Sequence, residues 1–259
     1  MEINGDQSPL HSCLADSGWY ENNGSRIEDF MRLFLFDIDG TLISGHGVGR
    51  MALTRAMQET YGTAGAYERY DFRGMTDPRI VRDLLRGAGI AEVIIRERLA
   101  ACFDLYVAYL EGLIADGHRV DVMPGIAEVV RALACRQDAL VGLLTGNIER
   151  GACAKLRPTG LLPFFRIGAY GSDNADRRQL PAVARTRAEA LVGRVLPFEC
   201  ILIIGDTPLD VDCARSCGAM AVAVATGQHA ANELADSGPD LLFTDFSDVP
   251  AAVHMLTQA

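Results

Sequence analysis

Two aspartates separated by one residue, Asp37 and Asp39, come directly after an apolar run and directly before Gly40. The run at residues 32–36 predicts a strand buried on both faces, as in the interior of a parallel sheet. Such a strand presents its last side chains at the carboxyl edge of the sheet, where open α/β proteins bind their ligands. Two carboxylates at that edge, roughly 6–7 Å apart by strand rise, suit a divalent cation and a nucleophile better than a hydrophobic core.

Three further polar segments also follow or border strand-like runs. They are Thr145-Gly146-Asn147, the loop at residues 171–178 with Arg177 and Arg178, and the aspartates Asp206 and Asp210. Taken singly, each segment also fits a turn or a helix cap. Because the carboxyl ends of parallel strands meet at one edge, the four segments together indicate one site. The hydroxyl of Thr145 and the N–H groups at Gly146 and Asn147 would face an anion there.

Strand-like and helical patterns alternate along most of the chain. Apolar runs lie at 32–36, 139–144, 165–170, 200–204, 219–225 and 241–243, and helical periods at 125–135, 147–156, 178–192 and 208–217. This alternation predicts an α/β fold with a Rossmann-like, doubly wound parallel sheet.

About a hundred residues between the first two strands break this rhythm, because their patterns at 48–61, 77–88 and 91–115 are helical. We therefore expect an inserted all-helical cap domain at 45–119. The catalytic core would comprise 31–44 and 120–259, with flexible joints beside the cap. The polar, aperiodic residues 1–30 indicate a flexible N-terminal tail or a mis-assigned start.

The composition of the chain argues against several classes of binding partner. The net charge of −10 and the absence of a lysine-rich stretch argue against nucleic acid or an anionic membrane surface. No apolar run approaches the ~20 residues that span a bilayer, and the N-terminus lacks the pattern of a secretory signal. The seven cysteines are scattered along the chain and fit reduced thiols, so we expect a cytoplasmic protein. We expect it to be a monomer or a homodimer.

With all four segments in order, the chain resembles the haloacid dehalogenase superfamily hydrolases, of the phosphoglycolate phosphatase and β-phosphoglucomutase type with a helical cap. The resemblance runs from about Met31 to the end and includes the segment Phe72-Arg73-Gly74-Met75-Thr76-Asp77. It implies a Mg²⁺-dependent phosphatase that hydrolyses a small phosphorylated metabolite through an aspartyl-phosphate intermediate.

The resemblance also implies a role for each acidic residue. Asp37 would be the nucleophile, and Asp39 would protonate the leaving oxygen and then activate water. Asp206, one oxygen of Asp37 and the backbone carbonyl of Asp39 would hold Mg²⁺. Asp210 would orient a metal-bound water or another ligand, and Thr145 would bind a phosphoryl oxygen.

The third family motif usually contains lysine, and here arginine stands in the expected loop. Arg177 is the first choice for this cation because Leu180 follows three residues later, as in similar sequences. Arg178 and, less well, Lys155 are the alternatives. An arginine still supplies a fixed positive charge and a bidentate fork for phosphate.

The cap is expected to select the substrate, with residues 44–50 and 72–77, notably Arg73 and Thr76, facing the pocket. Arg73 would pair with a substrate carboxylate or be a solvated surface residue. Asp39 favours phosphoryl transfer over dehalogenation, and a cap without lysine argues against a phosphonatase. A sugar phosphomutase and a non-catalytic metabolite-binding module are the alternative functions.

Overall fold

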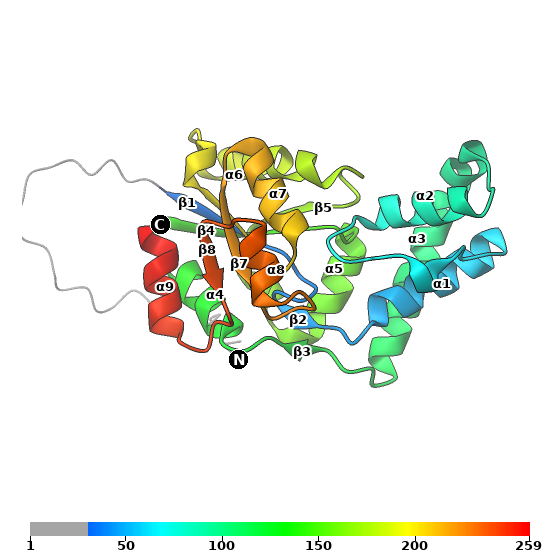
Figure 1. Cartoon of the computed structure of the whole chain (residues 1–259), viewed down its shortest axis with the longest axis horizontal. Helices are drawn as coiled ribbons and strands as arrows, with labels where there is room; N and C mark the ends of the chain where they lie inside the picture. The colour runs from blue at the N-terminus through cyan, green and yellow to red at the C-terminus, as the bar shows by residue number, and fades with distance from the viewer. Residues whose placement is uncertain (1–30) are drawn as a thin grey trace, which may run out of the picture. The chain divides into compact units, whose positions relative to one another are not determined.

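A parallel sheet of six strands forms the framework of residues 31–259, the part of the chain that the computed structural model describes (Figure 1). The expected tail at residues 1–30 lies outside the described residues. The strands are β1 (Arg32–Phe36), β4 (Ala139–Thr145), β5 (Ile167–Tyr170), β6 (Ile201–Gly205), β7 (Met220–Val224) and β8 (Leu241–Phe243). Their order is β5-β4-β1-β6-β7-β8, with every pairing parallel. The predicted doubly wound α/β fold is confirmed.

Strand β1 lies in the middle of the sheet and contributes side chains to two hydrophobic clusters. Leu33 and Leu35 point to one face, and Phe34 and Phe36 to the other. Helices cover both faces, which explains why the strand sequence is apolar throughout. The first face is covered by α6 (Leu180–Val192), α7 (Pro208–Cys217) and α8 (Ala231–Asp236), and the second by α4 (Ile126–Ala134), α5 (Glu149–Leu156) and α9 (Val249–Gln258).

The chain between β1 and α4 forms a helical insertion (residues 45–119) built from α1 (Val48–Tyr61), α2 (Asp77–Gly87) and α3 (Glu92–Ala115). These helices share a third hydrophobic cluster, to which Ile148 and Ala154 also belong. Two short strands, β2 (Ile43–Ser44) and β3 (Asp121–Val122), pair antiparallel where the chain enters and leaves the insertion. Residues 31–259 form one compact unit, so the expected division into core and cap domains stays a prediction.

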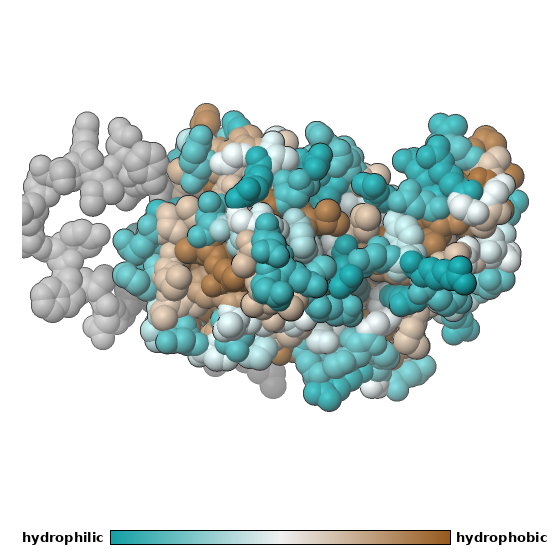
Figure 2. Space-filling model, in the orientation of Figure 1, coloured by the Kyte–Doolittle hydropathy of each residue, from teal (hydrophilic) through white to brown (hydrophobic). Residues whose placement is uncertain are grey.

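The face of this unit seen in Figure 2 is mainly polar. Figure 2 shows hydrophilic residues over most of the visible face, with apolar side chains in small patches. Between residues 31 and 259, the chain has no helix with the length and apolarity needed to cross a bilayer.

Candidate active site

The first aspartate of the site, Asp37, directly follows β1, and its backbone N–H donates to the carbonyl of Ile204 in β6 at 2.9 Å. Thr145 ends β4 on the other side of β1, and Asp206 directly follows β6. Because β4, β1 and β6 are neighbouring parallel strands in register, their carboxyl ends bring these three residues to one edge. The structure thus places together groups that are far apart in the sequence.

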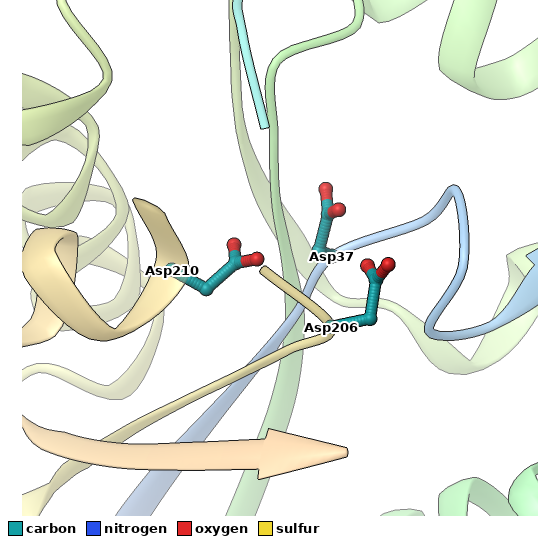
Figure 3. Close-up of side chains that lie close together, drawn as sticks. All are labelled: Asp37, Asp206 and Asp210. Atoms are coloured by element: carbon teal, nitrogen blue, oxygen red, sulfur yellow. The ribbon is translucent and has the colours of Figure 1, made fainter. Parts of the chain in front are cut away.

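Three carboxylates converge at this edge. Each of Asp37, Asp206 and Asp210 offers an oxygen atom within 4.8 Å of the others, and all three side chains are buried (Figure 3). Burial raises the pKa of Asp37 to about 6, although the charge of Arg177 acts in the opposite direction. Burial, together with the charges of Asp210 and Asp37, raises the pKa of Asp206 well above its usual range. A hard cation with oxygen ligands would relieve this repulsion.

The two oxygens of Asp210 are already occupied by hydrogen bonds. Oδ2 accepts from the N–H and the hydroxyl of Thr207 at 3.1 and 2.7 Å, and Oδ1 accepts from Arg177. Asp206 accepts only from the hydroxyl of Thr41 at 3.2 Å among the side-chain contacts of the described residues. Asp37 and Asp206 therefore have more lone pairs available to a cation than Asp210 has.

Glycines keep the space around Asp206 open. A Cβ atom at Gly40, where φ is +90°, would lie 2.2 Å from Oδ2 of Asp206. A Cβ atom at Gly227 would lie 1.7 Å from the same oxygen. Larger residues at either position would displace this carboxylate, so both glycines are needed for the close approach of the backbone to Asp206.

Arg177 supplies a buried positive charge beside the carboxylates. Its guanidinium lies 3.3 Å from Asp37 Oδ1, also contacts Asp210, and donates to the carbonyl of Gly74 at 3.3 Å. Burial alone would lower the pKa of Arg177, but Asp210 and Asp37 outweigh burial and raise it. Its Nε–H has no hydrogen-bond acceptor within residues 31–259. If Asp37, Asp206 and Asp210 are all ionised, their charges and that of Arg177 sum to −2. A divalent cation would neutralise this charge.

The carboxylate of Asp39 points to a different set of partners and is not part of the three-carboxylate group. Its Oδ2 accepts from Asn147 Nδ2 at 2.8 Å and from Lys155 Nζ at 2.6 Å. The backbone carbonyl of Asp39, rather than its side chain, was the atom expected at the cation, and that assignment stays a prediction. About 45% of the Asp39 side chain is exposed, so it remains accessible from the cavity.

Polar groups at the end of β4 and in the segment after it already make hydrogen bonds within the protein. Thr145 Oγ1 accepts from Asn147 Nδ2 at 2.8 Å. The carbonyl of Gly146 accepts from the backbone N–H of Asp77 at 2.8 Å. Helix α5 begins only at Glu149, so the N–H groups of Gly146 and Asn147 precede the helix that was expected to start at residue 147.

A cavity of about 790 Å³ lies at this edge of the sheet and is lined both by residues that follow the strands and by residues of the helical insertion. Residues 44–50 and Arg73 line it, together with Asp37, Asp39, Thr145, Lys155, Arg177 and Asp206. Arg73 is held by Asp71, whose two oxygens each accept one of its N–H groups at 2.8 Å.

Two expected substrate-binding residues lie elsewhere. Thr76 is buried, its hydroxyl donates to the carbonyl of Ala175 at 2.7 Å, and it is not among the described residues that line the cavity. Arg178 pairs with Asp212 at 2.7 Å on the surface, and it too is outside the cavity within residues 31–259. The structure therefore corrects both assignments, because one side chain is used in packing and the other in a surface ion pair.

Several cavity residues were not singled out from the sequence. Thr226 and Gly227, for example, follow β7. The rule that parallel strands end at one edge would have identified the loop after β7. Arg50 in α1 and Asp77 in α2 also line the cavity, and they lie within the segments 44–50 and 72–77 that were expected to face it.

Comparison with known proteins gives one family for this fold and site. Residues 31–218 match the model of the haloacid dehalogenase-like hydrolases. A phosphoglycolate phosphatase of Synechococcus elongatus is 24% identical over 87% of this chain and 99% of its own. Phosphoglycolate phosphatase 1 of Pseudomonas aeruginosa is 26% identical over 84% of this chain and 78% of its own. The crystal structure of CbbY from Rhodobacter sphaeroides in complex with phosphate superposes with a TM-score of 0.65 at 20% identity, covering 85% and 96% of the two chains.

Proposed function

Because the chain belongs to the haloacid dehalogenase-like hydrolases, we propose that it is a Mg²⁺-dependent phosphatase of a small phosphate monoester that works through an aspartyl-phosphate on Asp37. One observation carries the proposal. The buried carboxylates of Asp37 and Asp206 converge in the lining of a cavity, and the guanidinium of Arg177 lies 3.3 Å from Asp37 Oδ1. The cavity volume of about 790 Å³ suits a small molecule.

The chemistry of the donor set fits Mg²⁺. Asp37, Asp206 and the backbone carbonyl of Asp39 would hold the ion through oxygen atoms, and Asp210, already hydrogen-bonded at both oxygens, would orient its surroundings. When bound, the ion supplies positive charge that offsets the negative charge of the phosphoryl group. Arg177 adds a second positive charge from the protein itself.

Asp37 and Asp39 divide the covalent steps between them. An oxygen of Asp37 attacks phosphorus, the bond to the leaving oxygen breaks, and Asp39 gives that oxygen a proton. Asp39 then takes a proton from water, whose oxygen attacks phosphorus and breaks the bond to Asp37. Thr145 and Arg177 hold the phosphoryl oxygens during both steps.

A substrate with a second anionic group is the best fit to the cavity. Relatives called phosphoglycolate phosphatases cover most of the chain. Arg50, Arg69 and Arg73 of the helical insertion line the same cavity as the carboxylates. We therefore propose a phosphoglycolate-like substrate, whose carboxylate would face these arginines.

The test is a screen of phosphorylated metabolites against the purified full chain, with Mg²⁺ and with EDTA. We expect Mg²⁺-dependent release of inorganic phosphate by the wild type and its loss in D37N. Conversion of glucose 1-phosphate to glucose 6-phosphate without phosphate release would establish the phosphomutase instead. Ligand binding without turnover of any monoester would establish a non-catalytic module.

A further inference from the structure

Lys155 is the only lysine among the 259 residues of the chain. It lies on α5 and only 4% of its surface is exposed. Its Nζ donates to Asp39 Oδ2 at 2.6 Å and to Asn147 Oδ1 at 2.6 Å. Asn147 in turn donates to the same oxygen of Asp39, at 2.8 Å. Lysine, asparagine and aspartate thus form a closed triangle of hydrogen bonds.

This triangle is separate from the contacts of Arg177. The guanidinium of Arg177 contacts Asp37 and Asp210, whereas the ammonium of Lys155 contacts Asp39. The site therefore has two buried cations with different carboxylate partners. The positive charge beside the nucleophile is already provided by Arg177, which leaves the role of Lys155 to be explained.

We infer that Lys155, together with Asn147, is a positioning residue that fixes the carboxyl group of Asp39 for its two proton transfers. The inference rests on the proposed function, in which Asp39 is the acid and then the base. Two of the three hydrogen bonds of the triangle end on Oδ2 of Asp39. Oδ1 accepts no side-chain hydrogen bond from residues 31–259, so it is available for the leaving oxygen and then for water.

The surroundings of Lys155 explain why this cation is a lysine. A Cβ atom at Gly49 would lie 2.8 Å from Nζ of Lys155 and 3.7 Å from the hydroxyl of Tyr106. Helices α1 and α3 thus leave room for a compact ammonium, whose donors can rotate toward two acceptors. The planar guanidinium of arginine is larger and has a fixed fork, so it would not fit the same space without moving α1 or Asp39.

The experiment compares two esters that differ in their need for a proton. An alkyl phosphate leaves as an alkoxide and needs Asp39 as an acid, whereas p-nitrophenyl phosphate leaves as a stable phenolate. Both substrates need Asp39 as a base in the second step. Loss of Lys155 should therefore slow both steps for the alkyl ester but only the second step for the nitrophenyl ester.

For K155M we expect kcat on the alkyl ester to fall by about 10²-fold with KM changed by less than about threefold. With p-nitrophenyl phosphate, rapid mixing should show a burst of nitrophenolate at close to the wild-type rate, followed by slow turnover. K155R should not restore activity, because a guanidinium that does not fit the space of the ammonium cannot orient Asp39. R157M, which removes an exposed cation paired with Glu111, is the matched control and should behave as wild type.

Gly49 gives a second and independent variant. G49A lies within α1 at a backbone conformation that alanine adopts, so the helix should not be weakened. Its Cβ would displace the ammonium, and we expect the same burst kinetics in milder form. In the K155M background the G49A change should have little further effect, because the ammonium that the new Cβ would displace is absent.

Other outcomes would overturn the inference. If the burst itself slows and KM rises for both esters, Lys155 binds the phosphoryl group instead. If both esters lose activity in parallel with a lower melting temperature, Lys155 is structural. A wild type that releases no nitrophenolate, or a D37N variant that still does, would refute the proposed function rather than the role of Lys155.

Discussion

The carboxylate of Asp77 accepts the backbone N–H of Ile148 at 2.8 Å, which joins the start of α2 to the segment after β4. Asp77 in return donates its own N–H to the carbonyl of Gly146 at 2.8 Å. These two bonds connect the helical insertion directly to the segment that follows Thr145. The carboxyl group that makes this connection is buried beside Lys155, and burial raises its pKa to about 6.

This raised pKa predicts how Asp77 affects stability. The folded protein binds the proton of Asp77 more tightly than the unfolded chain does. The stabilisation that protonated Asp77 gives to the folded protein is therefore complete below pH ~3.8 and is lost as the pH rises through about 6. The two pKa values differ by about two units, equivalent to about 3 kcal/mol. D77N keeps an acceptor for Ile148 and removes the charge. We expect D77N to be more stable than wild type at pH 7, with the difference shrinking towards pH 4 in urea unfolding. An equal difference at both pH values would contradict the assignment.

Gly146 should be indispensable for the packing of the insertion on the sheet. A Cβ atom at this position would lie 2.1 Å from the carbonyl oxygen of Met75, and a backbone atom cannot rotate away. We expect G146A to lower the free energy of unfolding by at least about 2 kcal/mol. It should also expose the amide of Asp77 to hydrogen exchange. Gly112 is the matched control because a Cβ there meets no atom within 4 Å, so G112A should be neutral or slightly stabilising.

The sequence predicted the framework well because its signals are local or periodic. The strand β1 and the helices α1 and α7 begin and end where the pattern places them. The convergence of Asp37, Thr145 and Asp206 followed from the rule for parallel strand ends. Helices α8 and α9 were missed because α8 is only six residues long and α9 follows a short edge strand without a marked period.

The partners of each side chain could not be predicted in the same way. Lys155 and Asp39 are 116 positions apart, and the contact depends on how α1, α3 and α5 pack. Thr76 stands in a segment typical of the family, yet its hydroxyl turns to Ala175 rather than to the cavity. Periodicity fixes the face on which a residue lies but not which neighbour it contacts. The isolated lysine in an arginine-rich chain was the one available signal for Lys155.

Mg²⁺ should stabilise the protein measurably, because the three buried carboxylates repel one another without it. At a hundredfold excess over the dissociation constant, binding adds about 2.7 kcal/mol. This should raise the melting temperature by about 5–10 °C in a chain of this size. D206N should melt at a higher temperature than wild type in EDTA, because one repulsive charge is gone, and should show little response to Mg²⁺. D212N, which alters a surface ion pair, should respond as wild type does. An unchanged response in D206N would exclude this residue as a ligand.

Arg50 should matter more than Arg73 for an anionic second group on the substrate. Arg73 is already neutralised by Asp71, whereas the guanidinium of Arg50 lies 5.1 Å from the ring centre of Phe72 and donates to the carbonyl of Tyr67. The stacked guanidinium is held in place with its charge uncompensated by that contact. For phosphoglycolate we expect R50A to raise KM by about tenfold, an ion-pair effect of about 1.4 kcal/mol. R73A should change KM by less than about threefold, because an exposed ion pair contributes little free energy.

2-Hydroxyethyl phosphate, which replaces the carboxylate by an alcohol, should show no such difference between the two variants. If R73A raises KM for phosphoglycolate as strongly as R50A does, Asp71 does not neutralise Arg73 in the complex and both arginines face the carboxylate.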